Sequence, residues 1–163
     1  MDHLENSAEA VAWLAERGLV SHGTTISETE LSDLLELRTA VRALFVARID
    51  SCAPREQVVA TINRATRAAP SICSLSWTEA DPPTATMRHV RGTVMARALA
   101  EIAIDAIDTV CGERAKRLLE CETPGCVRLL EREHARQRWC STACGDRVRA
   151  ARYYSRHRSD PAL

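Results

Sequence analysis

The sequence predicts a mainly α-helical protein in two parts. Residues 1–112 are expected to form a helical domain with one β-hairpin, and residues 113–163 a small four-cysteine module that ends in a basic helix. Apolar residues recur at helical spacing through most of the first part. Residues 71–91 instead contain two alternating runs that are rich in β-branched or aromatic side chains. The third observation is that four of the seven cysteines fall in one short stretch, from Cys121 to Cys144.

The first helix is expected between Asn6 and Gly18. Asn6 is a favourable N-cap residue, and Glu9, three positions later, completes a capping-box pattern. Gly18 stands where a glycine commonly ends a helix. The residues expected on the buried face are Val11, Leu14 and Ala15, with Trp13 beside them.

The second and third helices carry start and stop signals of the same kind. Ser27 and Glu30 form a second capping-box pattern. A third helix fits between Pro54, at its first position, and Pro70, which bars its continuation. Because only 4% of the residues are aromatic, aliphatic side chains must supply most of the core. In the second helix those at helical spacing are Leu31, Leu34, Leu35, Val41, Leu44, Phe45 and Ile49.

A β-hairpin and a fourth helix complete the first part. The runs SICSLSW and TATMRHV flank the turn-forming residues TEADPPT, so residues 71–91 predict a hairpin. The next stretch, TVMARALAEIAIDAIDTVCG, predicts an amphipathic helix of about five turns that ends at Gly112. Trp77 in the hairpin is expected to be a core residue, as is Trp13.

The net charge of zero hides an asymmetry along the chain. Residues 1–110 carry a net charge of about −5 and residues 111–163 of about +5. Such an asymmetry is typical of a polyanion-binding tail, although a solvated basic surface explains it equally well. No run of 18 apolar residues predicts a membrane span, and the first ten residues lack the pattern of a signal peptide. We therefore expect a cytoplasmic protein whose thiols stay reduced.

The clustered cysteines have the spacing of a zinc site. Cys121 and Cys126 form one close pair, Cys140 and Cys144 form a second, and the segment 127–139 separates the pairs. Two such pairs predict one tetrahedral structural zinc, and the small number of large apolar residues after residue 118 means that this module needs such a staple. A disulfide framework or an iron–sulfur cluster fits the compartment and the spacing less well. His134 remains an alternative to one of the thiol ligands.

The other three cysteines are scattered. Cys52, Cys73 and Cys111 have no partner at ligand spacing, and we expect them to be small core residues.

The segment RWCSTACGDRVRAARYYSRHR resembles the CGNR zinc finger, which is named for a Cys-Gly-Asn-Arg run after a Trp-Cys dipeptide. Here the run is Cys144 to Arg147, and Asp146 stands where the family name has asparagine. In that family a Cys-x4-Cys pair precedes the run, and the finger follows an N-terminal domain called ABATE, to which the first two predicted helices are similar. The resemblance implies a stress-induced transcription regulator with a treble-clef-like or knuckle-type finger.

The basic helix expected over residues 141–158 suggests DNA as the partner. Arg149, Arg152 and Arg156 form a stripe at helical spacing, opposite the side that carries Cys144, and Arg147 and Arg158 flank it. Such a stripe can contact phosphates or guanine edges. The candidate contacts are Arg147, Arg149, Arg152, Arg156 and Arg158. The alternative function is a zinc-stabilised protein-interaction adaptor, with thiol redox sensing as a further layer on either function.

The helical first part, residues 1–112, shows no catalytic or ligand motif. It lacks a Gly-rich phosphate loop, a G-x-S-x-G run and an H-E-x-x-H run, so we do not expect an enzyme. The N-terminal domain could bind a small-molecule effector or form a homodimer that pairs two fingers on DNA.

Overall fold

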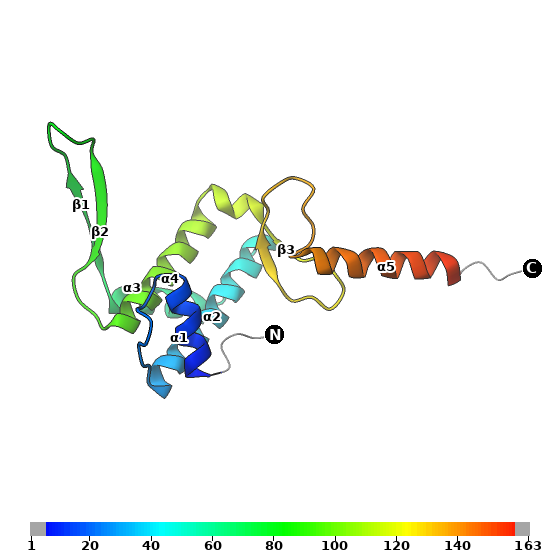
Figure 1. Ribbon diagram of the computed structural model, residues 1–163, viewed down its shortest axis with the longest axis horizontal. Coiled ribbons are helices and arrows are strands. Elements are labelled where there is room, and N and C mark those ends of the chain that lie inside the picture. Colours follow the sequence, from blue (N-terminus) through cyan, green and yellow to red (C-terminus); the bar gives the residue numbers. More distant parts are fainter. Residues whose placement is uncertain (1–5, 159–163) are drawn as a thin grey trace, which may run out of the picture. The chain divides into compact units, whose positions relative to one another are not determined.

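The computed structural model describes residues 6–158 of the chain (Figure 1). Its elements in chain order are α1 (Ser7–Glu16), α2 (Glu28–Ile49), α3 (Glu56–Ala68), β1 (Ser71–Ser76), β2 (Thr84–His89), α4 (Val94–Cys111), the 3₁₀ helix η1 (Glu113–Arg117), β3 (Leu118–Glu120), β4 (Leu129–Glu131) and α5 (Thr142–Arg158). This order confirms the predicted mainly helical fold with a hairpin and a C-terminal helical finger. Among the described residues, no helix has both the length and the apolar character that crossing a membrane demands.

The chain divides into two compact units that interleave in sequence. One unit, which we call the helical unit, comprises the described residues as far as Leu44 together with Pro54–Asp108. The other comprises Phe45–Ala53 together with the described residues from Thr109 onward. The last turn of α2 therefore groups with the four-cysteine region. Within that unit, Nε of Arg48 donates a hydrogen bond to the backbone oxygen of Val110, at 3.2 Å.

The ends of α1 follow the sequence signals. The side chain of Asn6 accepts a hydrogen bond from the backbone N–H of Glu9, at 2.9 Å. At the other end, Gly18 adopts a positive φ of 70°, and its N–H donates to the oxygen of Ala15 while the N–H of Leu19 donates to Leu14. This pair of bonds is a Schellman motif, which a glycine favours because it has no Cβ.

Helix α2 has the predicted capping box and a second Schellman motif. The Ser27 N–H donates to the Glu30 carboxylate at 2.9 Å, and the Glu30 N–H donates to the Ser27 hydroxyl at 3.2 Å. At its end the N–H of Cys52 bonds to the oxygen of Ala47, and Ser51 takes the left-handed position with φ of 54°. Ser51 bears a conformational cost there that a glycine would avoid.

Two clusters of small and aliphatic side chains form the core of the helical unit. Leu14 and Ala15 of α1 are buried in the first cluster, as the sequence predicted, and Val11 and Trp13 pack against it from half-buried positions. The buried members of the first cluster are Ala10, Leu14, Ala15, Val20, Leu34, Met95 and Ala98, and those of the second are Leu37, Ala40, Ile62 and Ala103. Five of these eleven residues are alanines, so small side chains supply much of the core.

A polar link joins α2 to α3. The Glu36 carboxylate accepts hydrogen bonds from Arg64, at 2.6 Å, and from the buried hydroxyl of Thr61, at 3.1 Å. These two bonds, led by the one from Arg64, lower the pKa of Glu36. The link satisfies the Thr61 hydroxyl, which would otherwise be costly to bury.

The β1–β2 hairpin projects from the helical unit (Figure 1). Its strands pair antiparallel from Ser71 opposite His89 to Ser76 opposite Thr84. At the base, Nδ1 of His89 donates to the oxygen of Ala69 at 2.8 Å. Gly92 follows with φ of +108°, and a Cβ at that position would lie 2.8 Å from the Cβ of Ala69. Only glycine therefore fits where the hairpin returns to the helices.

Several predicted details are wrong. Cys52, Cys73 and Cys111 are exposed rather than buried. Trp77 is 70% exposed, because it follows a strand that no other element covers. Other differences are small: α3 begins at Glu56 rather than at Pro54, since Arg55 is extended, and α4 ends at Cys111.

Candidate metal centre and nucleic-acid interface

The first cysteine pair lies in a short antiparallel hairpin. Strands β3 and β4 pair Leu118 with Glu131 and Glu120 with Leu129. The sequence prediction did not include these strands, although a signal was present. The run Arg-Leu-Leu-Glu occurs at residues 117–120 and again at residues 128–131, on either side of the cysteine pair. Two like strand segments flanking a Pro-Gly turn are a hairpin pattern.

A tight turn brings Cys121 and Cys126 together at the tip of this hairpin. The N–H of Cys126 donates to the oxygen of Thr123 at 2.9 Å, across Pro124 and Gly125. Gly125 has φ of +74°. Proline followed by a glycine at positive φ is the signature of a type II turn, which presents both thiols on one side.

The second pair lies at the beginning of α5. The hydroxyl of Ser141 accepts a hydrogen bond from the N–H of Cys144 at 3.3 Å, so Ser141 acts as the N-cap. Cys140 precedes this cap, and Cys144 lies in the first turn of the helix. The N–H of Cys140 also donates to Sγ of Cys121 at 3.4 Å, which links the two pairs. The positive end of the helix therefore faces the sulfur cluster.

The four sulfur atoms fit a tetrahedral metal ion. They all lie within 4.8 Å of one another. The separations from Cys126 to Cys140, from Cys140 to Cys144 and from Cys144 to Cys126 are 3.7, 3.6 and 3.8 Å. A regular tetrahedron with zinc–sulfur distances of about 2.3 Å has edges of about 3.8 Å. Four thiolates would fill the coordination of zinc and leave no position for water, as in a structural site.

Hydrogen bonds prepare this cluster for negative charge. One of them, from the Arg147 guanidinium to Sγ of Cys144 at 3.3 Å, is the main reason that the pKa of the Cys144 thiol falls to about 6. Burial and the neighbouring thiols raise the pKa of Cys140 to about 12. Four thiols this close together cannot all be ionised without a cation, because the negative charges repel one another. A divalent cation reduces that repulsion by neutralising half of the charge.

The comparisons with known families agree with this geometry. Residues 1–113 match the ABATE family, whose description is "putative stress-induced transcription regulator", and residues 117–157 match the CGNR zinc finger. The chain belongs to the ABATE family. No curated protein matches the chain. Together with the four-sulfur cluster, the match confirms the resemblance seen in the sequence and shows a CGNR finger with a single structural zinc.

Buried contacts hold the CGNR finger around its cluster. The Thr123 hydroxyl, which is buried, donates to the backbone oxygen of Cys144 at 3.2 Å and so ties the first turn to α5. Gly145 allows the ring of Trp139 to lie against the helix, because a Cβ on Gly145 would be 3.0 Å from that ring. The glycine and the tryptophan of the family signature thus form one packing contact.

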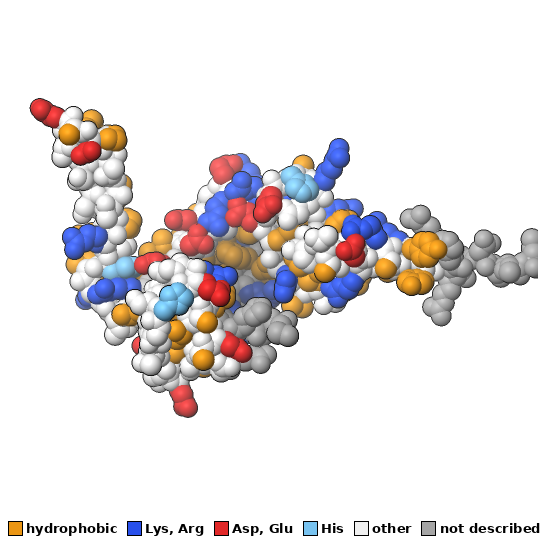
Figure 2. Space-filling view, in the orientation of Figure 1, with side chains coloured by type: hydrophobic (Ala, Val, Ile, Leu, Met, Phe, Trp, Pro, Cys, Tyr) orange, Lys and Arg blue, Asp and Glu red, His pale blue; other side chains and the backbone are white. Residues whose placement is uncertain are grey.

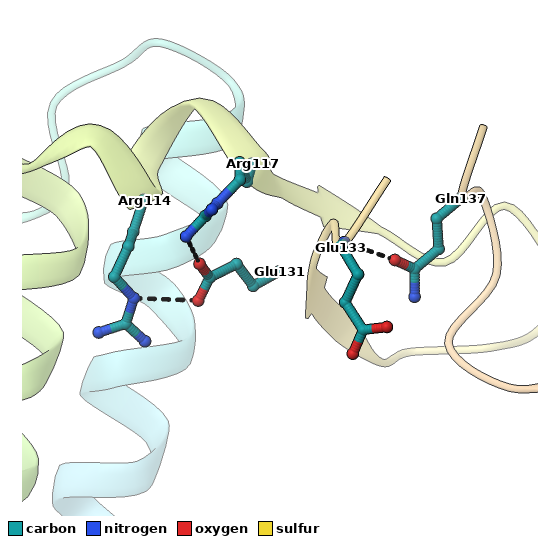
Figure 3. A network of polar contacts seen from close by, with 5 residues as sticks. All are labelled: Arg114, Arg117, Glu131, Glu133 and Gln137. Atoms are coloured by element: carbon teal, nitrogen blue, oxygen red, sulfur yellow. Dashed lines mark hydrogen bonds and ion pairs between the residues drawn. The ribbon is translucent and has the colours of Figure 1, made fainter. Parts of the chain in front are cut away.

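Charged residues anchor the base of the CGNR finger (Figure 3). The Glu131 carboxylate accepts hydrogen bonds from Arg114, at 3.0 Å, and from Arg117. These bonds, led by the one from Arg114, lower the pKa of Glu131. Farther along, the Glu133 N–H donates to the side-chain oxygen of Gln137 at 2.7 Å and shapes the loop that follows β4.

His134 lies on this loop and is exposed. It is not among the residues whose ligand atoms gather in the sulfur cluster.

The arginines of the predicted stripe differ in their surroundings. Arg147 points to the sulfur of Cys144. The guanidinium of Arg149 lies 5.8 Å from the centre of the Trp139 ring and pairs with Asp146 at 2.6 Å. Asp146, where the family name has asparagine, therefore gives this chain an ion pair on the helix surface. Helical periodicity placed both arginines outward but could not reveal these partners.

Arg152 is exposed and borders a groove between the Pro-Gly turn and α5. The groove has a volume of about 580 Å³, and its lining includes Thr123, Pro124, Val148 and Arg152. Within the described part of the chain, the guanidinium of Arg152 makes no hydrogen bond or ion pair. The side chains of the last two predicted contacts, Arg156 and Arg158, lie outside the described residues, although the backbone of α5 includes them.

Proposed function

We propose that the protein is a DNA-binding transcription regulator in which zinc holds the CGNR finger together and α5 contacts DNA. The observation that carries this proposal is the position of Arg152. Its exposed guanidinium is free of ion pairs among the described residues, and it projects from a helix whose first turn belongs to the metal site. Such a helix presents charge from a fixed position, which favours binding to a phosphate backbone.

We propose two roles for the five candidate arginines. With zinc bound, four thiolates leave a net charge of −2, which Arg147 offsets in part. Asp146 offsets Arg149. We therefore propose that Arg147 and Arg149 support the finger, and that Arg152 contacts DNA together with Arg156 and Arg158. Figure 2 shows several Lys and Arg side chains over the finger, which agrees with the positive charge of this half of the sequence.

Fluorescence anisotropy with DNA from the region upstream of the gene tests this proposal. We expect specific binding roughly a thousandfold tighter than binding to random duplex. Replacing Arg152 and Arg156 by alanine should weaken binding at least about tenfold. It should also reduce the slope of the logarithm of the binding constant against the logarithm of salt concentration by about two. Arg97→Ala is the control, because it removes one exposed charge from α4 in the helical unit. The proposal would be refuted by an equal loss of DNA affinity in both variants. Binding that does not depend on DNA sequence or salt concentration would refute it as well.

A zinc-stabilised interaction adaptor is the second candidate. The observation in its favour is that Tyr153 and Tyr154 on α5 are 58% and 69% exposed, since exposed tyrosines are common at protein interfaces. The DNA measurement separates the two candidates. An adaptor would show weak binding that is equal for all DNA fragments.

An effector would have a candidate groove in the helical unit. It lies between α1 and residues 22–26, has a volume of about 480 Å³, and its lining includes Val11, Ala15, His22 and Ile26. We propose this mainly apolar groove for a small, weakly polar effector. A rise in melting temperature on adding such a small molecule, which Val11→Glu abolishes, would support it.

A further inference from the structure

The β1–β2 hairpin has one apolar and one polar face. Cross-strand partners share a face, so Cys73 lies beside Met87 and Leu75 beside Ala85. Trp77 continues the same alternation just past β1. We name the face formed by Cys73, Leu75, Trp77, Ala85 and Met87 the apolar hairpin face. An antiparallel sheet with this alternation normally packs its apolar face against other residues.

Nothing in the described part of the chain covers the apolar hairpin face. Leu75 and Trp77 are each 70% exposed, and Met87 is 59% exposed. Only at the base does the hairpin meet the helical unit, where Nε2 of His89 lies 3.2 Å from the carboxylate of Glu101 on α4. A two-stranded hairpin is marginally stable alone in water, so this one needs a partner along its outer part.

The two ends of the hairpin carry opposite charges. Glu79 and Asp81 lie in the turn at the tip, and Arg91 follows β2 at the base. Arg88, opposite Ile72, lies on the polar face instead. Figure 2 shows acidic groups at the tip of the hairpin, basic groups near its base and apolar groups along its length. When two such hairpins pack antiparallel about a twofold axis, each acidic tip lies beside the basic base of the other.

We propose that the apolar hairpin face is a homodimer interface. Two copies pack these faces together with their hairpins antiparallel, tip to base. The twofold arrangement is isologous, so the same residues contribute from both subunits. The face has five side chains, far fewer than the roughly 20–30 residues that each partner contributes to a standard interface, so we expect a weak dimer with a dissociation constant on the order of micromolar. A lipid surface fits less well, because two carboxylates at the tip would have to enter it.

Sedimentation of the full-length zinc-loaded protein without DNA tests this proposal. We expect a reversible monomer–dimer equilibrium between roughly 1 and 300 µM, as the interface size implies. Leu75→Asp should weaken dimerisation at least about tenfold, because it places a charge in the apolar contact. Ser74→Asp is the matched control on the opposite face of the same strand and should have little effect. Both positions are exposed, and circular dichroism would verify that both variants fold.

A charge exchange tests the tip-to-base arrangement. Glu79→Arg with Asp81→Arg makes the tip basic, and Arg91→Glu makes the base acidic. Each of these two charge-reversal variants alone should dimerise less than the wild type, because both tip-to-base contacts then bring like charges together. Arg88→Glu, on the polar face, is the matched control and should have little effect. An equal mixture of the two charge-reversal variants should form heterodimers, because both contacts are then between opposite charges. A mixture that stays monomeric would overturn this arrangement.

Two results would overturn the interface itself. One is a wild-type protein that remains monomeric through the whole concentration range. The other is a dimer that Leu75→Asp and Ser74→Asp affect equally. Because this experiment contains no DNA, its failure leaves the DNA-binding proposal standing. Likewise, loss of DNA binding in the Arg152 variant does not bear on the dimer.

Discussion

Removing the zinc should unfold the CGNR finger and leave the helical unit folded. The buried apolar residues beyond Gly112, within the described chain, are Ala115, Cys121 and Cys144, and two of these are metal ligands. The helical unit instead has two aliphatic clusters. A structural zinc contributes on the order of 10–16 kcal/mol of apparent binding free energy, which the few apolar contacts of the finger cannot replace.

The size of the effect follows from the helix lengths. α5 has 17 residues, whereas α1, α2, α3 and α4 have 10, 22, 13 and 18, so α5 makes up about a fifth of the α-helix. If chelation melts α5, the helical circular dichroism signal at 222 nm should fall by about a fifth, since that signal is roughly proportional to helix content. The remaining signal should still unfold cooperatively with heat, because the helical unit has its own core.

Two serine variants provide the matched test without a chelator. Cys121→Ser should lose zinc and show the same partial loss of helix. Cys73→Ser, at an exposed cysteine far from the cluster in sequence, should keep one zinc per chain and the full signal. The argument would be refuted by a chelated protein that keeps all its helix. A loss of more than about half of the signal would refute it as well, because the helical unit would then depend on the metal.

Three further predictions concern single residues, and the first two are measured by urea unfolding. Gly92→Ala should cost about 2–6 kcal/mol, from backbone strain and a 2.8 Å overlap, whereas Gly23→Ala, at φ of +83° with open space around it, should cost about 1–2 kcal/mol. Equal costs would contradict the overlap. Ser51→Gly should stabilise the protein by about 0.5–1 kcal/mol, because it removes a left-handed serine, and a destabilised variant would argue against the Schellman geometry. Arg147→Ala should weaken zinc binding about 10–100-fold in a chelator competition, because it removes the hydrogen bond to the Cys144 sulfur, and unchanged affinity would contradict that role.

Local signals in the sequence predicted much of the fold. Ser27 and Glu30 form the capping box that their spacing indicated, and Gly18 ends α1 in the expected conformation. The four cysteines were equally predictable, because a tetrahedral site demands two close pairs. These features depend on residues near one another in the chain, which is why they can be inferred without tertiary contacts.

Features that depend on distant or unpaired surfaces were not predictable in the same way. Trp77 was expected in the core, because a large aromatic residue is usually buried, but the strand before it has no covering layer. Arg149 falls on the outer stripe of α5. Its guanidinium nevertheless pairs with Asp146 and contacts the ring of Trp139, which precedes the helix. A helical wheel gives the direction of a side chain and not what meets it there.

The interleaving of the two compact units has a practical consequence for dissecting the protein. The family matches divide the chain between residues 113 and 117, and a fragment cut there would seem to isolate the finger. Such a fragment would leave behind Phe45–Ala53, which belongs to the same compact unit as the finger. It would also lose the hydrogen bond that Arg48 donates to Val110. If such a fragment failed to bind DNA, the loss of Phe45–Ala53 from its own unit would explain the result as well as the loss of the helical unit.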